Sequence, residues 1–263
     1  MNKKKKYRLK SKYKPKNIIR KFSRKKRHRY RIKNSIVILF LVICLGLFVF
    51  SIYHIIKWRL DNNENKKIND EIVEKVIKDD RIDFKALLKI NPDTVGYLKV
   101  KNTNINYAVV KQKDNRFYLT HNFKKEYNIA GWIFVDYRNQ VDGTDKNITI
   151  YGHNMRDGSM FGSLKKTLYS DWYGDKENLK ISFDTPKDNY IYEVFSLYRI
   201  KKEEYYTKNT FESDKEYESF LNKLKERSYV NFDKKLSSKD KIITLSTCDT
   251  NNKYRIILHA VLK

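Results

Sequence analysis

The residue of this sequence best suited to nucleophilic chemistry is Cys248, one of only two cysteines in the chain. It ends the strand-like stretch IITLSTC. Because successive residues of a strand point to opposite sides, Ile243, Leu245 and Thr247 share one face, whose core residues are Ile243 and Leu245. The other face is small and polar, and it consists of Thr244, Ser246 and Cys248. The polar side ends in the thiol, as the floor of a groove would. A buried structural cysteine is the alternative, but its neighbours on that face are polar, which favours a nucleophile.

A cysteine nucleophile usually needs a histidine to generate or stabilise its thiolate. Three histidines lie beyond residue 56, and their settings differ. His121 lies in YLTHNF with no evident site chemistry, and His259 lies within an apolar strand pattern that is typical of a structural histidine. His153 comes where the strand pattern NITIYG meets a loop, and strand ends beside loops are where rigid scaffolds present catalytic groups. We therefore select His153.

An acyl-transfer site also needs positive charge or N–H donors where negative charge develops on oxygen. Arg255 follows Cys248 by seven residues, across the turn formed by residues 249–253. If the flanking strands pair as a hairpin, Arg255 lies near the thiol, on the face opposite Ile256 and Leu258. A surface arginine is the alternative in a chain with 57 Lys and Arg, so Arg255 is a weak signal by itself.

A membrane anchor precedes these residues in the chain. Residues 35–56 read SIVILFLVICLGLFVFSIYHII, with no Lys, Arg, Asp or Glu. At about 1.5 Å per residue this run spans roughly 33 Å, enough to cross a bilayer core of about 30 Å. Cys44 lies inside it, so Cys248 has no partner for an internal disulfide. Two alternatives fit this run less well. The run is too long and too uniformly apolar for a buried core helix, and it is too long for the apolar part of a cleavable signal peptide.

The segment before the span, residues 1–34, is strongly basic. It contributes 18 of the 57 Lys and Arg and no Asp or Glu, so it carries +18 of the formal net charge of +26 over 263 residues. The positive-inside rule predicts a cytoplasmic tail and places residues 57–263 outside the cell. The tail then lies against anionic lipids of the inner leaflet. The alternative is a nucleic-acid-binding arm, which the charge alone would permit.

Beyond the span, the sequence predicts a linker at 57–69, a helical segment at 70–90 that breaks near residues 79–80, and then many short strands. Eight strands are expected, at 95–100, 105–111, 131–136, 147–152, 179–183, 190–200, 240–247 and 254–262. Two helical insertions are expected at 160–170 and 213–227. This pattern favours a mainly β protein built as a closed or partly closed barrel. Two cysteines and no Cys-x-x-Cys pair argue against a disulfide framework or a zinc site.

Three stretches taken together closely resemble the class B sortases: TLSTCD (244–249), YRIILHA (254–260) and YGHNMRDGSMF (151–161). The resemblance covers roughly residues 70–263. It includes INPDTVGYL (90–98), which is similar to the family's entry into its first strand, and the helix expected at 213–227. It implies an eight-stranded sortase barrel with N-terminal helices. The catalytic domain would then be 70–263, outside a Gram-positive cell and anchored by one transmembrane helix.

The resemblance also implies a role for each site residue. Cys248 would be the nucleophile, His153 the general acid or base, and Arg255 the stabiliser of the oxyanion or substrate, while Ser246 and Thr247 would line the substrate groove. The implied enzyme is a cysteine transpeptidase, a cysteine endopeptidase and acyltransferase in one. Cys248 attacks the carbonyl of a Thr in a C-terminal sorting motif, and a cell-wall amine then resolves the acyl-enzyme.

The expected partners are surface proteins that bear a C-terminal sorting signal, a peptidoglycan precursor or other cell-wall amine, and membrane lipids. No nucleic acid and no cofactor are expected, since the sequence has no nucleotide loop, metal-ligand spacing or haem motif. Two other classes stay open. An idle, membrane-tethered peptide-binding module would bind sorting peptides without cleaving them. A nucleic-acid binder would use the tail and need no Cys248.

The expected topology can be tested in intact cells stripped of their wall. Because the basic residues before Ser35 should hold the N-terminus inside, external protease should degrade residues 61–263 and spare the tail. Immunoblots with antibodies to each end measure this. Protection of the C-terminal part would contradict the extracellular location.

Overall fold

The computed structural model describes residues 16–78, 81–248 and 253–263, with side chains described from residue 33 onward except at 78 and 248. The expected helix break at 79–80 and the turn at 249–252 lie outside the described residues. The chain forms two compact units, residues 1–57 and 58–263. We describe each by itself.

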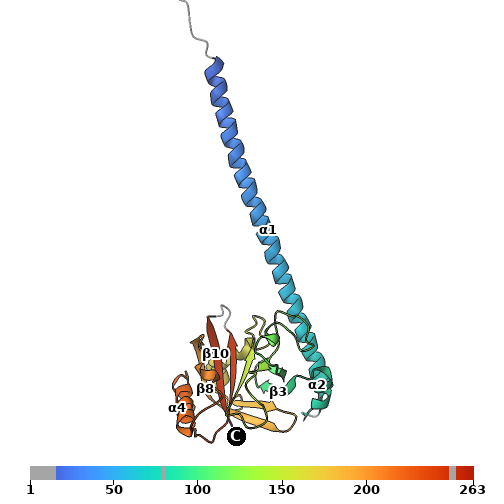
Figure 1. The fold of residues 1–263 in the computed structure, drawn as a ribbon, viewed down its shortest axis with the longest axis vertical. Helices are drawn as coiled ribbons and strands as arrows, with labels where there is room; N and C mark the ends of the chain where they lie inside the picture. Colours follow the sequence, from blue (N-terminus) through green and yellow to red (C-terminus); the bar gives the residue numbers. More distant parts are fainter. Residues whose placement is uncertain (1–15, 79–80, 249–252) are drawn as a thin grey trace, which may run out of the picture. The chain divides into compact units, whose positions relative to one another are not determined.

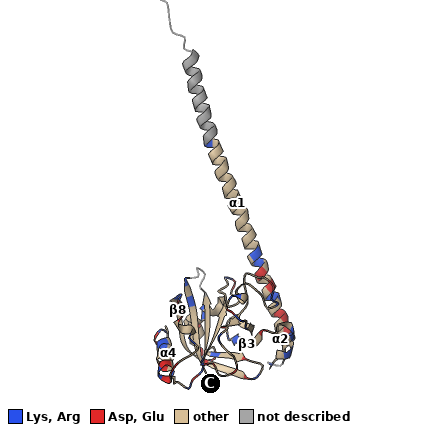
Figure 2. Ribbon diagram, in the orientation of Figure 1, with Lys and Arg blue, Asp and Glu red and all other residues tan. Residues whose placement is uncertain are grey.

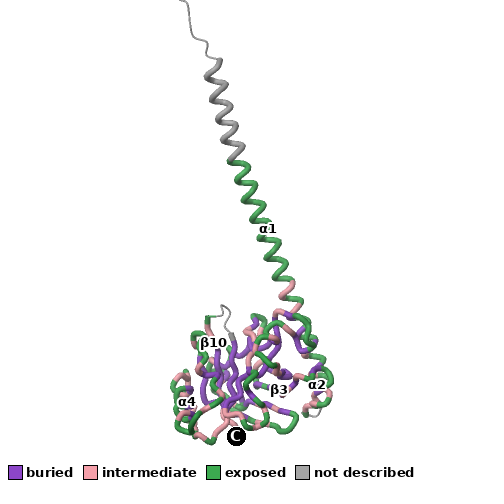
Figure 3. Tube along the Cα trace, viewed as in Figure 1, coloured by how far each residue is buried: buried purple, intermediate pink, exposed green. Residues whose placement is uncertain are grey.

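The first unit is the greater part of helix α1 (Lys16–Val76). Its side chains from 33 to 56 are all exposed (Figure 3), and its apolar stretch shows no charged residue between Lys33 and Lys57 (Figure 2). By length and composition this helix can cross a membrane. An apolar surface of this size on an isolated helix is unstable in water, so it needs lipid or protein around it.

The second unit begins with the last turns of α1, where a linker at 57–69 was expected and the structure differs. This segment is helical, and a stripe of its side chains is buried: Asn62, Asn65, Ile68, Ile72 and Val76. Asn65 Nδ2 donates to Gly131 O at 2.9 Å, and Asn128 Nδ2 donates to Asp61 O at 2.9 Å. The polar residues that suggest a linker therefore attach the helix to the loop at 128–131.

The rest of the expected helical segment is helix α2 (Phe84–Ile90), which is separated from α1 by the short strands β1 (Ile77–Lys78) and β2 (Arg81–Ile82). Asp83 caps α2, because its carboxylate accepts from Ala86 N at 2.9 Å. Asn91, just before Pro92, ends the helix, as the Asn-Pro pair predicts.

An eight-stranded closed barrel forms the body of this unit, which confirms the expected architecture (Figure 1). Around the barrel the order is β10-β8-β7-β3-β4-β5-β6-β9. Neighbours are antiparallel except for β4–β5 and β6–β9, which are parallel. The strands are β3 (Thr94–Val100), β4 (Asn106–Val110), β5 (Phe134–Val135), β6 (Asn147–Gly152), β7 (Lys180–Asp184), β8 (Asn189–Lys201), β9 (Ile242–Cys248) and β10 (Tyr254–Leu262).

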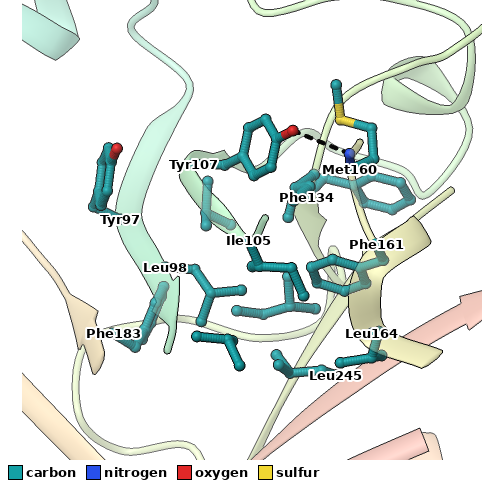
Figure 4. Packing of buried hydrophobic residues seen from close by; sticks show 14 of the residues in the cluster. Tyr97, Leu98, Ile105, Tyr107, Phe134, Met160, Phe161, Leu164, Phe183 and Leu245 are labelled. Carbon is teal, nitrogen blue, oxygen red and sulfur yellow. Dashed lines mark hydrogen bonds between the residues drawn. The ribbon is translucent and has the colours of Figure 1, made fainter. Parts of the chain in front are cut away.

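The barrel interior is the main hydrophobic core. Ile243 and Leu245 of β9 belong to it, as the period of two predicts (Figure 4 labels Leu245). The same cluster includes Leu98, Ile105, Phe161 and Phe183. At the edge of this cluster Tyr107 Oη accepts a hydrogen bond from Met160 N at 3.1 Å.

A second apolar cluster covers the outer face of β8, β9 and β10. Helix α4 (Asp214–Glu226) supplies it through Tyr217, Phe220, Leu221 and Leu224, whose spacing forms one helical stripe. Ser213 caps this helix and accepts from Glu216 N at 3.2 Å. The short 3₁₀ helix η3 (Tyr205–Thr207) adds Tyr206. The insertion expected at 213–227 thus packs on the barrel.

The other expected insertion, 160–170, forms a 3₁₀ helix η2 (Gly162–Leu168) followed by the short helix α3 (Ser170–Tyr173). Gly162 is required here, since a Cβ atom at this position would lie 2.1 Å from Met155 O. The loop after β6 and helix η2 therefore pack backbone against backbone.

His259 is fully buried beneath α4, in keeping with the structural role expected from its sequence setting. Its Nε2 lies 2.9 Å from Tyr198 Oη, and its Nδ1 lies 2.8 Å from Thr244 Oγ1. Burial lowers the pKa of His259 from 6.5 to about 3, because the imidazolium would lose its hydration. The folded barrel therefore holds this side chain neutral.

We expect the stability of the second unit to fall as the pH drops below 6.5 toward 3. Over that window the unfolded chain binds a proton at His259 that the folded chain does not, which costs roughly 2 kcal/mol at pH 5. Urea unfolding of residues 58–263 at pH 7.5 and pH 5, for wild type and His259→Gln, isolates this group. The stability advantage of the wild type should shrink by about that amount at pH 5; an unchanged difference would contradict the assignment.

Candidate active site

Three strands of the barrel bring the predicted catalytic residues to one end. Cys248 ends β9, and its Cα pairs with that of Arg255 near the start of β10. On the other side of β9, the parallel strand β6 pairs Gly152 with Thr247. His153 follows Gly152 and therefore comes level with Cys248. Paired Cα atoms of neighbouring strands lie about 5 Å apart, so the backbone brings all three positions together. The thiol itself lies outside the described side chains.

His153 is half-buried at the mouth of the barrel. Its Nε2 lies 2.8 Å from Leu119 O, at the end of the 3₁₀ helix η1 (Phe117–Leu119). A carbonyl can only accept, so Nε2 carries the proton and the ring orientation is held. Phe161 N donates to His153 O at 3.0 Å, which fixes the backbone as well. His121, by contrast, stacks on the Phe117 ring with centroids 4.1 Å apart.

Arg255 is half-buried, and its Nη1 donates to Tyr254 O at 3.1 Å. Its side chain lines a pocket of about 290 Å³. The walls come from four places, namely the loop between β4 and η1, the loop after β5, the end of β6 and the segment after β8: Asn115, Asp136, Tyr137, Arg138, Tyr151, Lys202, Glu203, Glu204, Tyr206 and Thr207. The pocket lies on the outer side of the sheet, beside the strand end that holds Cys248.

A buried carboxylate organises this pocket, and sequence reasoning did not find it. The Asp136 carboxylate accepts two hydrogen bonds from the Arg138 side chain at 2.8 Å each and one from Arg138 N at 3.0 Å. It also accepts from Tyr151 Oη at 2.9 Å and from Asn115 Nδ2 at 3.1 Å. Arg138 also donates to Thr207 O at 3.1 Å and so attaches η3 to the loop after β5. The Asp-x-Arg spacing after a predicted strand was the available signal.

Electrostatics stabilise the charged form of Asp136. Burial would raise the pKa of this carboxyl group, but the hydrogen bonds from Arg138 and Tyr151 outweigh burial and leave the pKa below its usual value. Burial, together with the same carboxylate, raises the pKa of Tyr151. Tyr151 therefore stays protonated and keeps donating to Asp136. The pair forms a fixed wall rather than a proton-exchanging group.

Ser246 and Thr247 are enclosed rather than open. Ser246 is 2% exposed, and its Oγ lies 3.1 Å from Tyr206 Oη. Thr247 is 1% exposed and faces the other way along the strand. The polar face of β9 expected as a groove floor is covered by η3 and α4 over most of its length. Contact of Ser246 or Thr247 with substrate stays a prediction. Among the side chains that the structure describes, no three His, Cys, Asp or Glu gather as a metal site.

Comparison with known proteins places this chain and its fold in one family. A sortase domain family model matches residues 98–263. The chain is 39% identical over 222 residues to sortase B of Listeria monocytogenes, covering 81% of this chain and 89% of that protein. It is 31% identical over 226 residues to sortase B of Staphylococcus aureus, covering 83% and 91%. A solved structure of sortase B from Bacillus anthracis shares 41% identity, covers 77% of this chain and 98% of its own, and superposes with a TM-score of 0.69.

A barrel with this strand order and these relatives defines a sortase. The chain belongs to the sortase family, in its class B.

Proposed function

We propose that this sortase is a cysteine transpeptidase with Cys248 as nucleophile, His153 as general acid and base, and Arg255 as the donor to the developing oxyanion. The observation that carries the proposal is the backbone register, in which positions 153, 248 and 255 meet at one end of β6, β9 and β10. The family supplies the reaction type, because the curated relatives are sortases. One solved relative is described as a Staphylococcus aureus sortase B–substrate complex.

In the first step the Cys248 thiolate attacks the carbonyl carbon of the Thr in a C-terminal sorting motif. The carbonyl oxygen becomes an oxyanion, which Arg255 stabilises by charge and hydrogen bonding. His153 then gives a proton to the leaving amine as the C–N bond breaks. The C-terminal segment departs, and a thioester joins the surface protein to Cys248.

In the second step an amine of the cell wall attacks the thioester carbon. His153 accepts the amine proton as the new amide bond forms, and the Cys248 thiolate leaves. The hydrogen bond from His153 Nε2 to Leu119 O supports this role, because it leaves Nδ1 as the nitrogen that exchanges the proton. Peptidoglycan precursors or other cell-wall amines are the acceptor class, and one solved relative is a sortase B complexed with triglycine.

The same proposal sets the location of the enzyme. The apolar part of α1 anchors the chain in the cell membrane, with residues 1–34 cytoplasmic and against anionic lipid. The catalytic unit then faces the wall, where both substrates are. The pocket beside Arg255 is suited to part of the sorting peptide, and the segment 202–207 that forms one wall is suited to set the motif preference.

Replacing Cys248 tests the reaction directly. Cys248→Ser keeps the shape but offers a hydroxyl that His153 is not matched to activate, so transpeptidation should fall by at least about 1,000-fold. Mass spectrometry of the full chain with a panel of sorting-signal peptides measures both product and acyl-enzyme. Cys44→Ser is the matched control and should retain activity. Substantial turnover by Cys248→Ser would show that this cysteine is structural, and peptide binding without cleavage by the wild type would favour an idle binding module.

Arg255→Ala should lose about 100- to 1,000-fold in turnover, the usual effect of removing one oxyanion donor. Arg255→Lys should recover only part of this loss, because an ammonium lacks the planar fork of donors. Thermal melts should change little, since Arg255 lines a pocket. Lys201→Ala, exposed on the neighbouring strand β8, is the control. Near-normal turnover in Arg255→Ala would assign the oxyanion to backbone N–H groups instead.

A further inference from the structure

A second pocket opens at the same end of the barrel. Its volume is about 390 Å³, and its lining includes Asn154, Arg156, Lys165, Tyr169, Arg199 and Ile256. Asn154 directly follows His153, and Ile256 directly follows Arg255. This pocket therefore adjoins the end of β6 and the start of β10, which also border the pocket beside Arg255.

The two pockets lie on opposite faces of β10. Successive residues of a strand point to opposite sides, and Arg255 lines the first pocket while Ile256 lines the second. A transpeptidase must admit its second substrate while the acyl group occupies the first pocket. A pocket across the strand offers the acceptor amine a separate approach to the thioester at Cys248.

The second pocket is strongly basic. Arg156, Lys165 and Arg199 all line it, and none of the residues that line it in the described part of the chain is Asp or Glu. Arg156 and Lys165 are exposed and make no ion pair with any described carboxylate. The neighbouring Asp157 is not among the lining residues, and its carboxylate accepts hydrogen bonds from Asn62 Nδ2 and Ser159 Oγ. Arg199 lies over the Tyr254 ring at 4.1 Å. Apolar surface from Met155, Leu168 and Ile256 lies between the charges.

The two walls of this pocket are held together before any ligand arrives. Phe161 N bonds to His153 O at 3.0 Å, and Gly158 N bonds to Met155 O at 3.1 Å. Gly162 packs its Cα against Met155 O, where no side chain would fit. Lys165, on η2, therefore keeps a fixed relation to the loop that carries His153 and Arg156. With the backbone already in place, only the two exposed side chains need to be ordered when an anion binds.

We propose that this second pocket binds the acyl acceptor and selects an amine whose molecule also carries a free carboxylate. The inference rests on the proposed transpeptidase function. Arg156 and Lys165 would bind the carboxylate while the amine of the same molecule reaches the thioester. Guanidinium and ammonium groups bind carboxylates through charge-assisted hydrogen bonds, which an uncharged amide does not replace.

Triglycine and triglycine amide form a matched pair of probes, because they differ only in the C-terminal charge. The full-length protein in detergent micelles is given a sorting-signal peptide that it cleaves, with either probe. Liquid chromatography with mass spectrometry then measures aminolysis product against hydrolysis product. Wild type should use triglycine about tenfold better than its amide. Arg156→Gln combined with Lys165→Gln should reduce this preference to about twofold or less, while Lys166→Gln, exposed on η2 outside the pocket, should keep it.

Measuring acyl-enzyme formation by intact-protein mass spectrometry distinguishes a failure of the acceptor proposal from a failure of the proposed transpeptidase function. The double variant should acylate at the wild-type rate, since its change concerns the acceptor alone. Equal use of both probes by the wild type, or an undiminished preference in the double variant, would overturn the acceptor proposal and leave the transpeptidase intact. Absence of any acyl-enzyme in the wild type would instead overturn the proposed function. Loss of acylation in the double variant would assign the pocket to the sorting peptide.

Discussion

The site depends on the pairing of strand β9 with two different kinds of neighbour. β6 runs parallel to it and β10 runs antiparallel to it, so the end of β6, the end of β9 and the start of β10 meet at one edge of the barrel. A slip of one residue in either pairing would turn every side chain of that strand to the opposite face. Ile243 and Leu245 in the core oppose such a slip, and in this way the hydrophobic core sets the position of Cys248 against His153 and Arg255.

The covering of β9 explains why only its end is available for chemistry. Thr244 donates to Asn147 Oδ1 at 2.7 Å and contacts His259, while Ser246 contacts Tyr206. These polar side chains are satisfied within the fold, beneath η3 and α4. A buried polar group without a partner would cost about 1–3 kcal/mol, so the cover needs these contacts. Beyond Ser246 the cover gives way to the pocket that Arg255 lines.

Local patterns predicted much of this structure, and long-range contacts account for what they did not predict. Local sequence patterns indicated the eight strands and the helix expected at 213–227, which is α4, because such signals lie within a few neighbouring residues. The segment 57–69 reads as a linker, since the partners of Asn62 and Asn65 lie more than 60 residues away. The Asp136–Arg138 pair escaped notice for the same reason. Its role appears only when Tyr151 and Thr207 are beside it.

The three proposed catalytic residues differ in how far sequence and structure each support them. Cys248 and His153 stood out in the sequence by residue type and position, whereas Arg255 was one basic residue among 57. The strand register strengthens the assignment of Arg255, because it makes this residue the direct partner of Cys248 on the neighbouring strand β10. The same strand then separates two pockets of different character. The first contains the Asp136–Arg138 pair and Glu204, and the second contains cations without a lining carboxylate among the described residues. In the proposed two-step reaction, the acceptor would approach the carbonyl from the second pocket while the acyl group still occupies the first.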